Sequence, residues 1–261
     1  MKHYWNVYKV FIANAFSYDA QYRSDAWLKV VISLLQVGLM FLTIDIVFSQ
    51  TSSIAGWTKA EVYLMTLLLT MADELGTALF SQIGYIPNII AEGDLDFYLL
   101  RPINSIFLIT CKYILLRAAY RFLSLIPVLV WVLFKFDFKI TLSNGILGLL
   151  MFIISVFVVY SFTLIANTFS FWFPRIDNVS DAILTIKDFS RFPLDIWPKT
   201  IKILFLTAIP IAFSGFMPAA TFVGKWPWYG ILYAVIFCIV LFTIAVKFWN
   251  FALKRYSSAS S

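Results

Sequence analysis

Long apolar stretches separated by short polar ones make up most of this chain. Five of them reach roughly the 20 residues that an α-helix needs to cross the hydrocarbon core of a bilayer. They cover residues 28–49, 62–83, 118–136, 145–172 and 228–251. A further apolar stretch at 201–223 contains Pro210 and Pro218 and is ambiguous. The pattern predicts an all-α polytopic membrane protein with six transmembrane helices.

Composition supports a membrane location. Hydrophobic residues form 61% and charged residues 13% of the 261 residues, and the mean hydropathy is +0.86. Soluble domains contain about 45–50% apolar and about 25% charged residues. The lipid bilayer is therefore the first partner that the sequence predicts.

Residues 1–27 are predicted to form an amphipathic segment in the membrane interface. Lys2, Asn6 and Lys9 alternate with aromatic and apolar residues at helical spacing, which is typical of interfacial helices. The apolar set is Tyr4, Trp5, Tyr8, Phe11, Ala15 and Phe16. An ordinary flank of the first span fits this pattern equally well.

The positions of lysine and arginine predict the orientation, because cytoplasmic loops of membrane proteins are enriched in both. With the N-terminus in the cytoplasm, few of them lie on the outer side: Lys59, Lys135, Lys139 and Lys225. Both termini are then cytoplasmic, and residues 254–261 form a tail. The net charge of +6 reflects this orientation, so no nucleic-acid partner is needed to explain it.

Residues that could carry catalysis are scarce. His3 is the only histidine, and Cys111 and Cys238 lie within apolar stretches, so no zinc site or disulfide framework is predicted. The chain contains no GxxxxGK[ST] sequence and cannot hold ATP in a P-loop of its own. We expect that the chain binds no cofactor and is not an enzyme by itself.

Polar residues recur along one face of the second span. Spacings of three and four residues bring them together on a helix, and burying an Asp in lipid costs about 2.5–3.5 kcal/mol. The set is Thr66, Thr70, Asp73, Thr77 and Ser81, with Glu74 beside Asp73. This face should point to the protein interior or a water-filled path.

Cationic residues begin the third span. Arg117 and Arg121 are four residues apart and share a helical face. They could pair with Asp73 or Glu74, reach lipid phosphates, or line a substrate entrance. Asp45 is expected to reach the headgroups, and an interfacial aromatic belt is expected to hold Trp57, Trp131, Trp172, Trp226 and Trp228.

The stretch "EGDLDFYLLRP" at residues 92–102 differs from its apolar neighbours. It lies in the predicted cytoplasmic loop 84–104, where Asp94 can begin a short helix that Pro102 limits. Acidic residues beside exposed Phe and Leu side chains suggest a protein partner.

Three motifs carry a resemblance to a known family. "GDLDFYLLRPI" resembles the G-x-L-D-x-x-L-x-R-P signature of permease subunits of bacterial type-2 ABC exporters, in particular viologen and drug-efflux permeases. "RFPLDIWPKTIKILFLTAIPIAFSGFMPAATFVG" is similar to the segment before the last span of such exporters, and "ALKRYSSASS" to the usual C-terminal ending.

The resemblance implies the permease half of an ATP-driven exporter in the bacterial plasma membrane. A second copy or a related permease would complete the pathway, and a separate ATP-binding subunit would hold ATP and magnesium. The coupling helix of the family corresponds to residues 88–100. The residues predicted to contact the ATPase are Glu92, Asp94, Asp96, Phe97, Tyr98, Leu99 and Arg101.

The resemblance also changes the predicted topology. Hydropathy makes 201–223 the fifth span, whereas the family pattern makes 177–192 a short polar fifth span within a single transmembrane domain, 28–253. Residues 193–224 then form an extracellular re-entrant segment. The second arrangement weakens the charge bias from 16 inside and 4 outside to 12 and 8. We favour it because Pro210 and Pro218 suit a broken element.

Two other function classes stay open. An ATP-independent secondary transporter could use Asp73 and Glu74 as proton or cation sites. A membrane scaffold or immunity subunit that transports nothing is the second alternative. The substrate is not predicted by any of these motifs.

Overall fold

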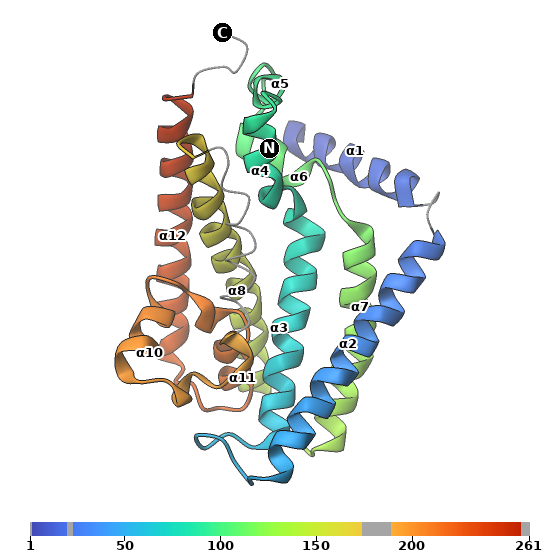
Figure 1. The fold of residues 1–261 in the computed structure, drawn as a ribbon, viewed down its shortest axis with the longest axis vertical. Helices are drawn as coiled ribbons and strands as arrows, with labels where there is room; N and C mark the ends of the chain where they lie inside the picture. Colours follow the sequence, from blue (N-terminus) through green and yellow to red (C-terminus); the bar gives the residue numbers. More distant parts are fainter. Residues whose placement is uncertain (1, 20–22, 174–188, 257–261) are drawn as a thin grey trace.

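The computed structural model describes residues 2–19, 23–173 and 189–256. Six helices of 18 residues or more dominate it (Figure 1). They are α1 Lys2–Asp19, α2 Arg23–Ser49, α3 Lys59–Phe80, α7 Leu116–Lys135, α8 Leu142–Thr168 and α12 Tyr229–Leu253. In the described ranges no β-strand occurs beyond an isolated bridge between Ile54 and Trp57. The prediction of an all-α polytopic membrane protein is confirmed.

Short helices occupy the connections between the long ones. They are η1 Ser81–Tyr85, α4 Ile86–Ala91, α5 Leu95–Leu99, α6 Ser105–Cys111, η2 Phe169–Phe171, η3 Phe189–Arg191, η4 Leu194–Ile196, α10 Lys199–Leu206, η5 Ile211–Phe213 and α11 Phe216–Phe222. Five helical segments in the described residues are long and apolar enough to cross a membrane. They contain α2, α3, α7, α8 and α12, as the apolar pattern predicts. The polar span predicted at 177–192 lies largely outside the described residues.

The interpretation of 201–223 as one span is wrong. The segment forms two helices of eight and seven residues, α10 and α11, joined through η5. Neither approaches the roughly 20 residues that a crossing requires. Both lie at the end of the bundle that also holds the α2–α3 loop (Figure 1). Pro210, which precedes η5, has no backbone N–H and cannot continue the ladder of α10.

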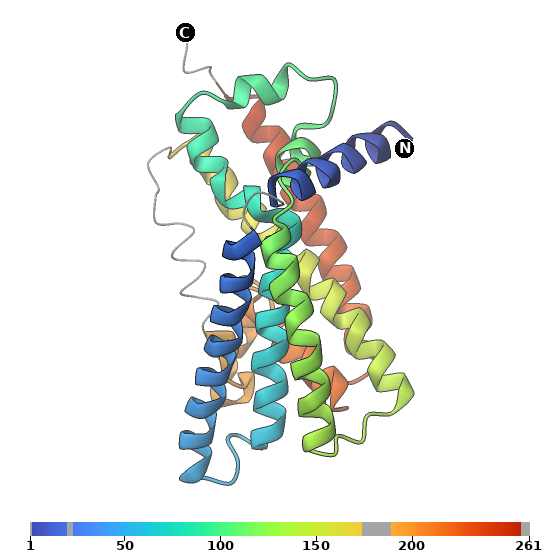
Figure 2. The ribbon, with the colours of Figure 1, turned by 90° about the vertical axis from the view of Figure 1, so that its right-hand side faces the viewer.

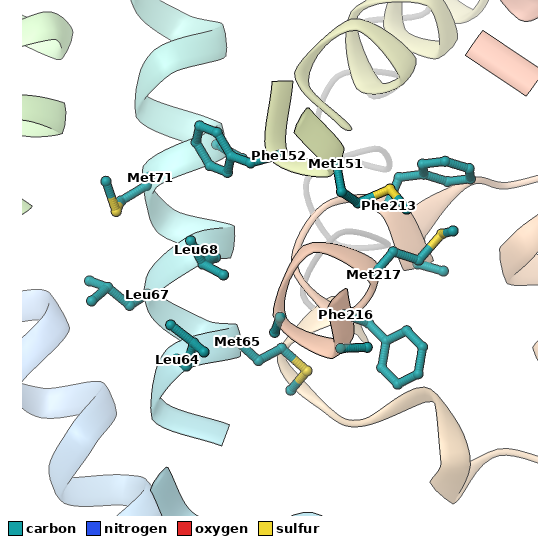
Figure 3. Packing of buried hydrophobic residues seen from close by; sticks show 14 of the residues in the cluster. Leu64, Met65, Leu67, Leu68, Met71, Met151, Phe152, Phe213, Phe216 and Met217 are labelled. Carbon is teal, nitrogen blue, oxygen red and sulfur yellow. The ribbon is translucent and has the colours of Figure 1, made fainter. Parts of the chain in front are cut away.

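Helix α3 is the centre of the bundle. It contacts α2 and α7 on one side and α8 and α11 on the other. Figure 3 shows its Leu64, Met65 and Leu68 facing side chains of α8, η5 and α11. Gly215 permits this approach, because a Cβ there would lie 2.9 Å from Leu69 Cβ and 3.0 Å from the Met65 carbonyl oxygen.

The two ends of the bundle carry different elements. Helices α1, α4, α5 and α6 lie at the end where both termini are found, and α1 runs across the bundle there (Figures 1 and 2). This direction is the one expected of an interfacial helix. Beneath α4–α6 lies a second apolar cluster, separate from the main core. Its buried members are Ile83, Ile86, Ile89, Ile90, Leu95, Ile106, Ile109, Tyr160, Leu164, Ala245 and Trp249.

Candidate functional site

Helices α4 and α5 form the tip of the molecule at the end with the termini (Figure 1). Pro87 lies in the first turn of α4, where a missing N–H costs nothing. Gly93 separates the helices with a φ of 79°, a left-handed conformation that favours glycine. The short helix expected from Asp94 onward is confirmed as α5. The stretch 88–100, which the family resemblance implies as the coupling helix, is divided into α4 and α5 with a corner at Gly93.

The tip presents large apolar side chains to its surroundings. Phe97 is 66% and Leu100 is 82% exposed, and Leu99 is exposed as well. Glu92, Asp94 and Arg101 are also exposed and surround them. Apolar side chains with a charged border are typical of protein-binding surfaces. Leu100 was not among the predicted contact residues, although an apolar residue before Arg-Pro in a polar loop was a signal for it.

Two predicted contact residues lie against the chain itself instead. The Lys112 ammonium lies 4.9 Å from the centre of the Tyr98 ring and 3.4 Å from its hydroxyl. Asp96 lies beside Tyr256: burial first, and then the Asp96 charge, raises the pKa of the Tyr256 hydroxyl. Tyr98 and Asp96 therefore fasten the tip to neighbouring segments, while Phe97, Leu99 and Leu100 remain available on its surface.

The tip is joined to two long helices by its buried face. Leu95 is fully buried in the second apolar cluster, which also contains Tyr160 and Leu164 of α8 and Ala245 and Trp249 of α12. The indole nitrogen of Trp249 donates to the Ser105 hydroxyl of α6 at 3.1 Å. Displacement of the tip would therefore act directly on α8 and α12.

The polar face of α3 lines a cavity of about 340 Å³ next to α8. Asp73, Thr77 and Ser81 contribute to its wall from one side, and Tyr160 and Thr163 from the other. Thr66 is buried deeper in the bundle, and the Thr70 hydroxyl donates to its carbonyl oxygen at 2.9 Å. The structure therefore brings the second half of the predicted polar face to a partly open cavity, which we call the polar cavity after these side chains.

Glu74 lies on the other side of α3 and is paired. Its Oε2 is 2.8 Å from Nη2 of Arg121 on α7, in an ion pair that lacks the alignment of a hydrogen bond. Arg117, one turn earlier on α7, pairs with Asp25 of α2. Internal pairing was one of the predicted roles of these arginines. The sequence analysis did not predict Asp25 as a partner of Arg117. Its position in the first turn of α2, at the same end of the bundle as the predicted cationic residues, was a signal for this pairing.

The described geometry is that of a helical bundle with an exposed tip and the partly open polar cavity between α3 and α8. The family described as ABC-2 family transporter protein matches residues 34–260, which is most of the chain. The chain belongs to this family. It is therefore a membrane-embedded permease component of an ABC transporter. A comparison with curated proteins found no match.

The opposite end of this ABC-2 permease is closed by polar contacts. The indole nitrogen of Trp57 donates to Asp195 Oδ2 at 2.9 Å, and Asp195 also pairs with Lys202. The Lys225 ammonium lies 2.6 Å from Glu61 Oε2 and 4.6 Å from the centre of the Trp57 ring. We call Trp57, Glu61, Asp195, Lys202 and Lys225 the closing network.

One expectation at this end of the permease is corrected. Trp57 is 2% exposed, so it belongs to the protein core and not to an interfacial belt. Asp45 is about half exposed and pairs with Lys59 at 2.9 Å, and its contact with headgroups stays a prediction. Trp131 and Trp228 are exposed, as expected for an aromatic belt.

Proposed function

We propose that this permease is one half of the translocation pathway of an ATP-driven exporter and that a separate ATP-binding subunit docks on the α4–α5 tip. A second copy, or a related permease, completes the pathway. ATP and magnesium are held by the ATP-binding subunit. Both termini and the tip face the cytoplasm of a bacterial cell, where ATP is available.

The single observation that carries the proposal is the tip itself. It exposes Phe97, Leu99 and Leu100 within a border of charges, at the end where both termini lie. The Leu95 side chain is meanwhile fully buried between the tip and the long helices. Mechanical coupling between an ATPase and the bundle requires a surface that binds the ATPase and is packed firmly onto the long helices.

The mechanism follows from these contacts. Nucleotide binding would draw two ATP-binding subunits together and displace the tips that they hold. Each tip moves α8 and α12 through the second apolar cluster, and the bundle shifts between two packings. Nucleotide biases this equilibrium because the ATP-binding subunits bind one packing better than the other.

Loss of partner binding tests the proposal. The permease is co-expressed with candidate ATP-binding subunits from the same organism to find one that co-purifies, and Phe97, Leu99 and Leu100 are then changed to Ala together. We expect at least a tenfold loss of co-purified ATPase. The matched control is Leu142→Ala, an 82% exposed leucine at the start of α8, at the opposite end. Full transport after all of Glu92, Asp94, Asp96, Phe97, Tyr98 and Leu99 are changed to Ala would refute the coupling role.

Orientation has its own test. Leu100→Cys at the tip and Ser53→Cys in the α2–α3 loop are both exposed positions at opposite ends of the bundle. In intact cells, a membrane-impermeant maleimide should label only Ser53→Cys. Labelling of Leu100→Cys alone would place the tip outside and exclude a cytoplasmic ATPase as its partner.

An ATP-independent transporter that uses internal acids is the second candidate. Asp73 favours it, because this carboxylate lines the polar cavity. Glu74 does not, because Arg121 already compensates its charge. Transport driven by a proton gradient in vesicles that contain only this chain, and its loss in Asp73→Asn, would select this candidate over the exporter.

A further inference from the structure

A larger cavity lies away from the tip and the polar cavity. It has a volume of about 620 Å³ and is bounded by α1, α2 and α7. In Figures 1 and 2 these helices meet at the corner where α1 ends and α2 begins. Drug-sized ligands occupy pockets of about 300–1,000 Å³, so this cavity can hold the polar end and part of the hydrocarbon body of one amphiphilic molecule.

The wall of this cavity combines aromatic rings with one acid. Phe16 of α1, Trp27 of α2 and Tyr120 of α7 contribute a ring each, and Asp19 contributes a carboxylate. Asp19 is only 8% exposed. No lysine or arginine belongs to the described lining. A carboxylate with little access to water favours a cationic hydrogen-bond donor beside it.

This combination indicates the class of ligand. A primary ammonium group donates hydrogen bonds to a carboxylate and is attracted to the faces of aromatic rings. The remaining lining is largely apolar and includes Val30 and Leu123, which suits a hydrocarbon body. The fitting ligand is an amphiphile with an amine at the polar end.

The position of the cavity indicates the source of the ligand. It shares no described lining residue with the polar cavity between α3 and α8, so it is separate from the candidate pathway. Trp27 is 72% exposed and Leu123 is exposed as well, on helices that are long and apolar enough to cross a membrane. The cavity therefore opens toward the bilayer, beside a helix that lies across the bundle end.

We propose that this cavity binds one membrane phospholipid by its ethanolamine headgroup, with Asp19 as the acceptor of the ammonium and Phe16, Trp27 and Tyr120 around it. The bound lipid links α1 to α2 and α7. The proposal does not depend on the ATPase partner, because every described lining residue comes from this one chain.

Lipid retention by the full chain tests the proposal. The protein is purified in neutral detergent, incubated with equal amounts of phosphatidylethanolamine and phosphatidylglycerol, and analysed by native mass spectrometry. Because Asp19→Asn removes the charged acceptor of the ammonium group and leaves a neutral amide, it should lower the retained phosphatidylethanolamine by at least about tenfold. The matched control Asp137→Asn changes an exposed acid whose φ of 47° suits Asn, and it should retain the wild-type amount.

A second variant keeps the test decisive if Asp19→Asn folds poorly. Leu123→Trp enlarges an exposed lining residue and should lower the retention of phosphatidylethanolamine without changing the melting temperature in detergent alone. Equal retention of both lipids by the wild type would overturn the proposal. So would displacement of the lipid by a single-tailed quaternary ammonium amphiphile that binds more tightly, because the cavity would then be a cargo site.

Discussion

Large side chains are exposed at the α4–α5 tip and buried at the end that carries the closing network. At the tip, Phe97 and Leu100 are exposed, and one buried leucine, Leu95, anchors the helix. At the other end, Trp57 and Phe213 are almost fully buried. Trp57 donates a hydrogen bond to Asp195 of η4, which pairs with Lys202 of α10, and its ring lies under the Lys225 ammonium of the α11–α12 connection.

This difference separates an end whose charges are compensated within the chain from the tip that we propose as the docking site of an ATP-binding subunit. The closing network compensates its charges within the chain, since Glu61 meets Lys225 and Asp195 meets Lys202. The tip leaves Glu92, Asp94 and Arg101 on its surface. An exposed apolar surface with a charged border is typical of protein-binding surfaces, which agrees with the proposed docking. We therefore expect variants to affect stability at one end and partner binding at the other.

Trp57→Ala should have the largest effect on stability. It removes a buried aromatic side chain and the indole donor of Asp195, and comparable truncations cost about 3–5 kcal/mol. Thermal unfolding in detergent should show a clear fall in the melting temperature. The control Trp228→Ala removes a 77% exposed tryptophan at the same end and should change it little. Equal effects of the two variants would show that the closing network does not hold this end together.

Leu95→Ala should destabilise the tip. The side chain is fully buried, and removal of buried leucine atoms costs about 2–5 kcal/mol. Hydrogen exchange should accelerate across residues 86–104, while α3 and α8 stay protected. Leu100→Ala, on the exposed side of the same element, should weaken ATPase binding without faster exchange. Faster exchange in both variants would mean that the tip has no separate anchor.

Glu74→Gln should have an intermediate effect. It leaves the partly buried guanidinium of Arg121 without its counter-charge, and an unsatisfied buried group costs about 1–3 kcal/mol. The double variant with Arg121→Gln should recover part of this loss, which a double-mutant cycle measures. Asp73→Asn, which faces the polar cavity, should change transport more than stability. Additive effects of the Glu74 and Arg121 changes would exclude their coupling.

The smallest effect is a pH dependence of the closing network. Burial raises the pKa of Asp195. Hydrogen bonds from Lys202 and Trp57 and the charges of Lys202 and Lys225 lower it by a larger amount, so the pKa lies below its ordinary value of 3.8. Such a group stabilises the fold above its unfolded pKa, and this contribution is lost as pH falls through the folded pKa.

Melting temperatures measured across this range test the prediction. Below about pH 4, the wild type should lose stability more steeply than Asp195→Asn, because the variant has no proton to gain at this position. Asp137→Asn removes an exposed carboxylate and should follow the wild type. Identical slopes for all three proteins would show that Asp195 contributes nothing to the pH dependence.

The amino-acid sequence alone determined the class of this protein and the positions of five candidate spans. Hydropathy over about 20 residues and helical spacing are local properties, so α2, α3, α7, α8 and α12 follow from them. The same is true of the loop around Gly93, whose acids and glycine stand out from apolar neighbours. The GDLDFYLLRPI motif indicated the family before any contact was known.

Only the tertiary structure decided which side chains meet. Arg117 pairs with Asp25 and Arg121 with Glu74, and spacing along α7 cannot distinguish these from the other pairings that it permits. Trp57 is buried in the main apolar cluster, where Asp195, 138 positions away, accepts its indole N–H. Such contacts depend on how helices from distant parts of the chain pack. A single sequence shows the polar face of each helix but not the helix that faces it.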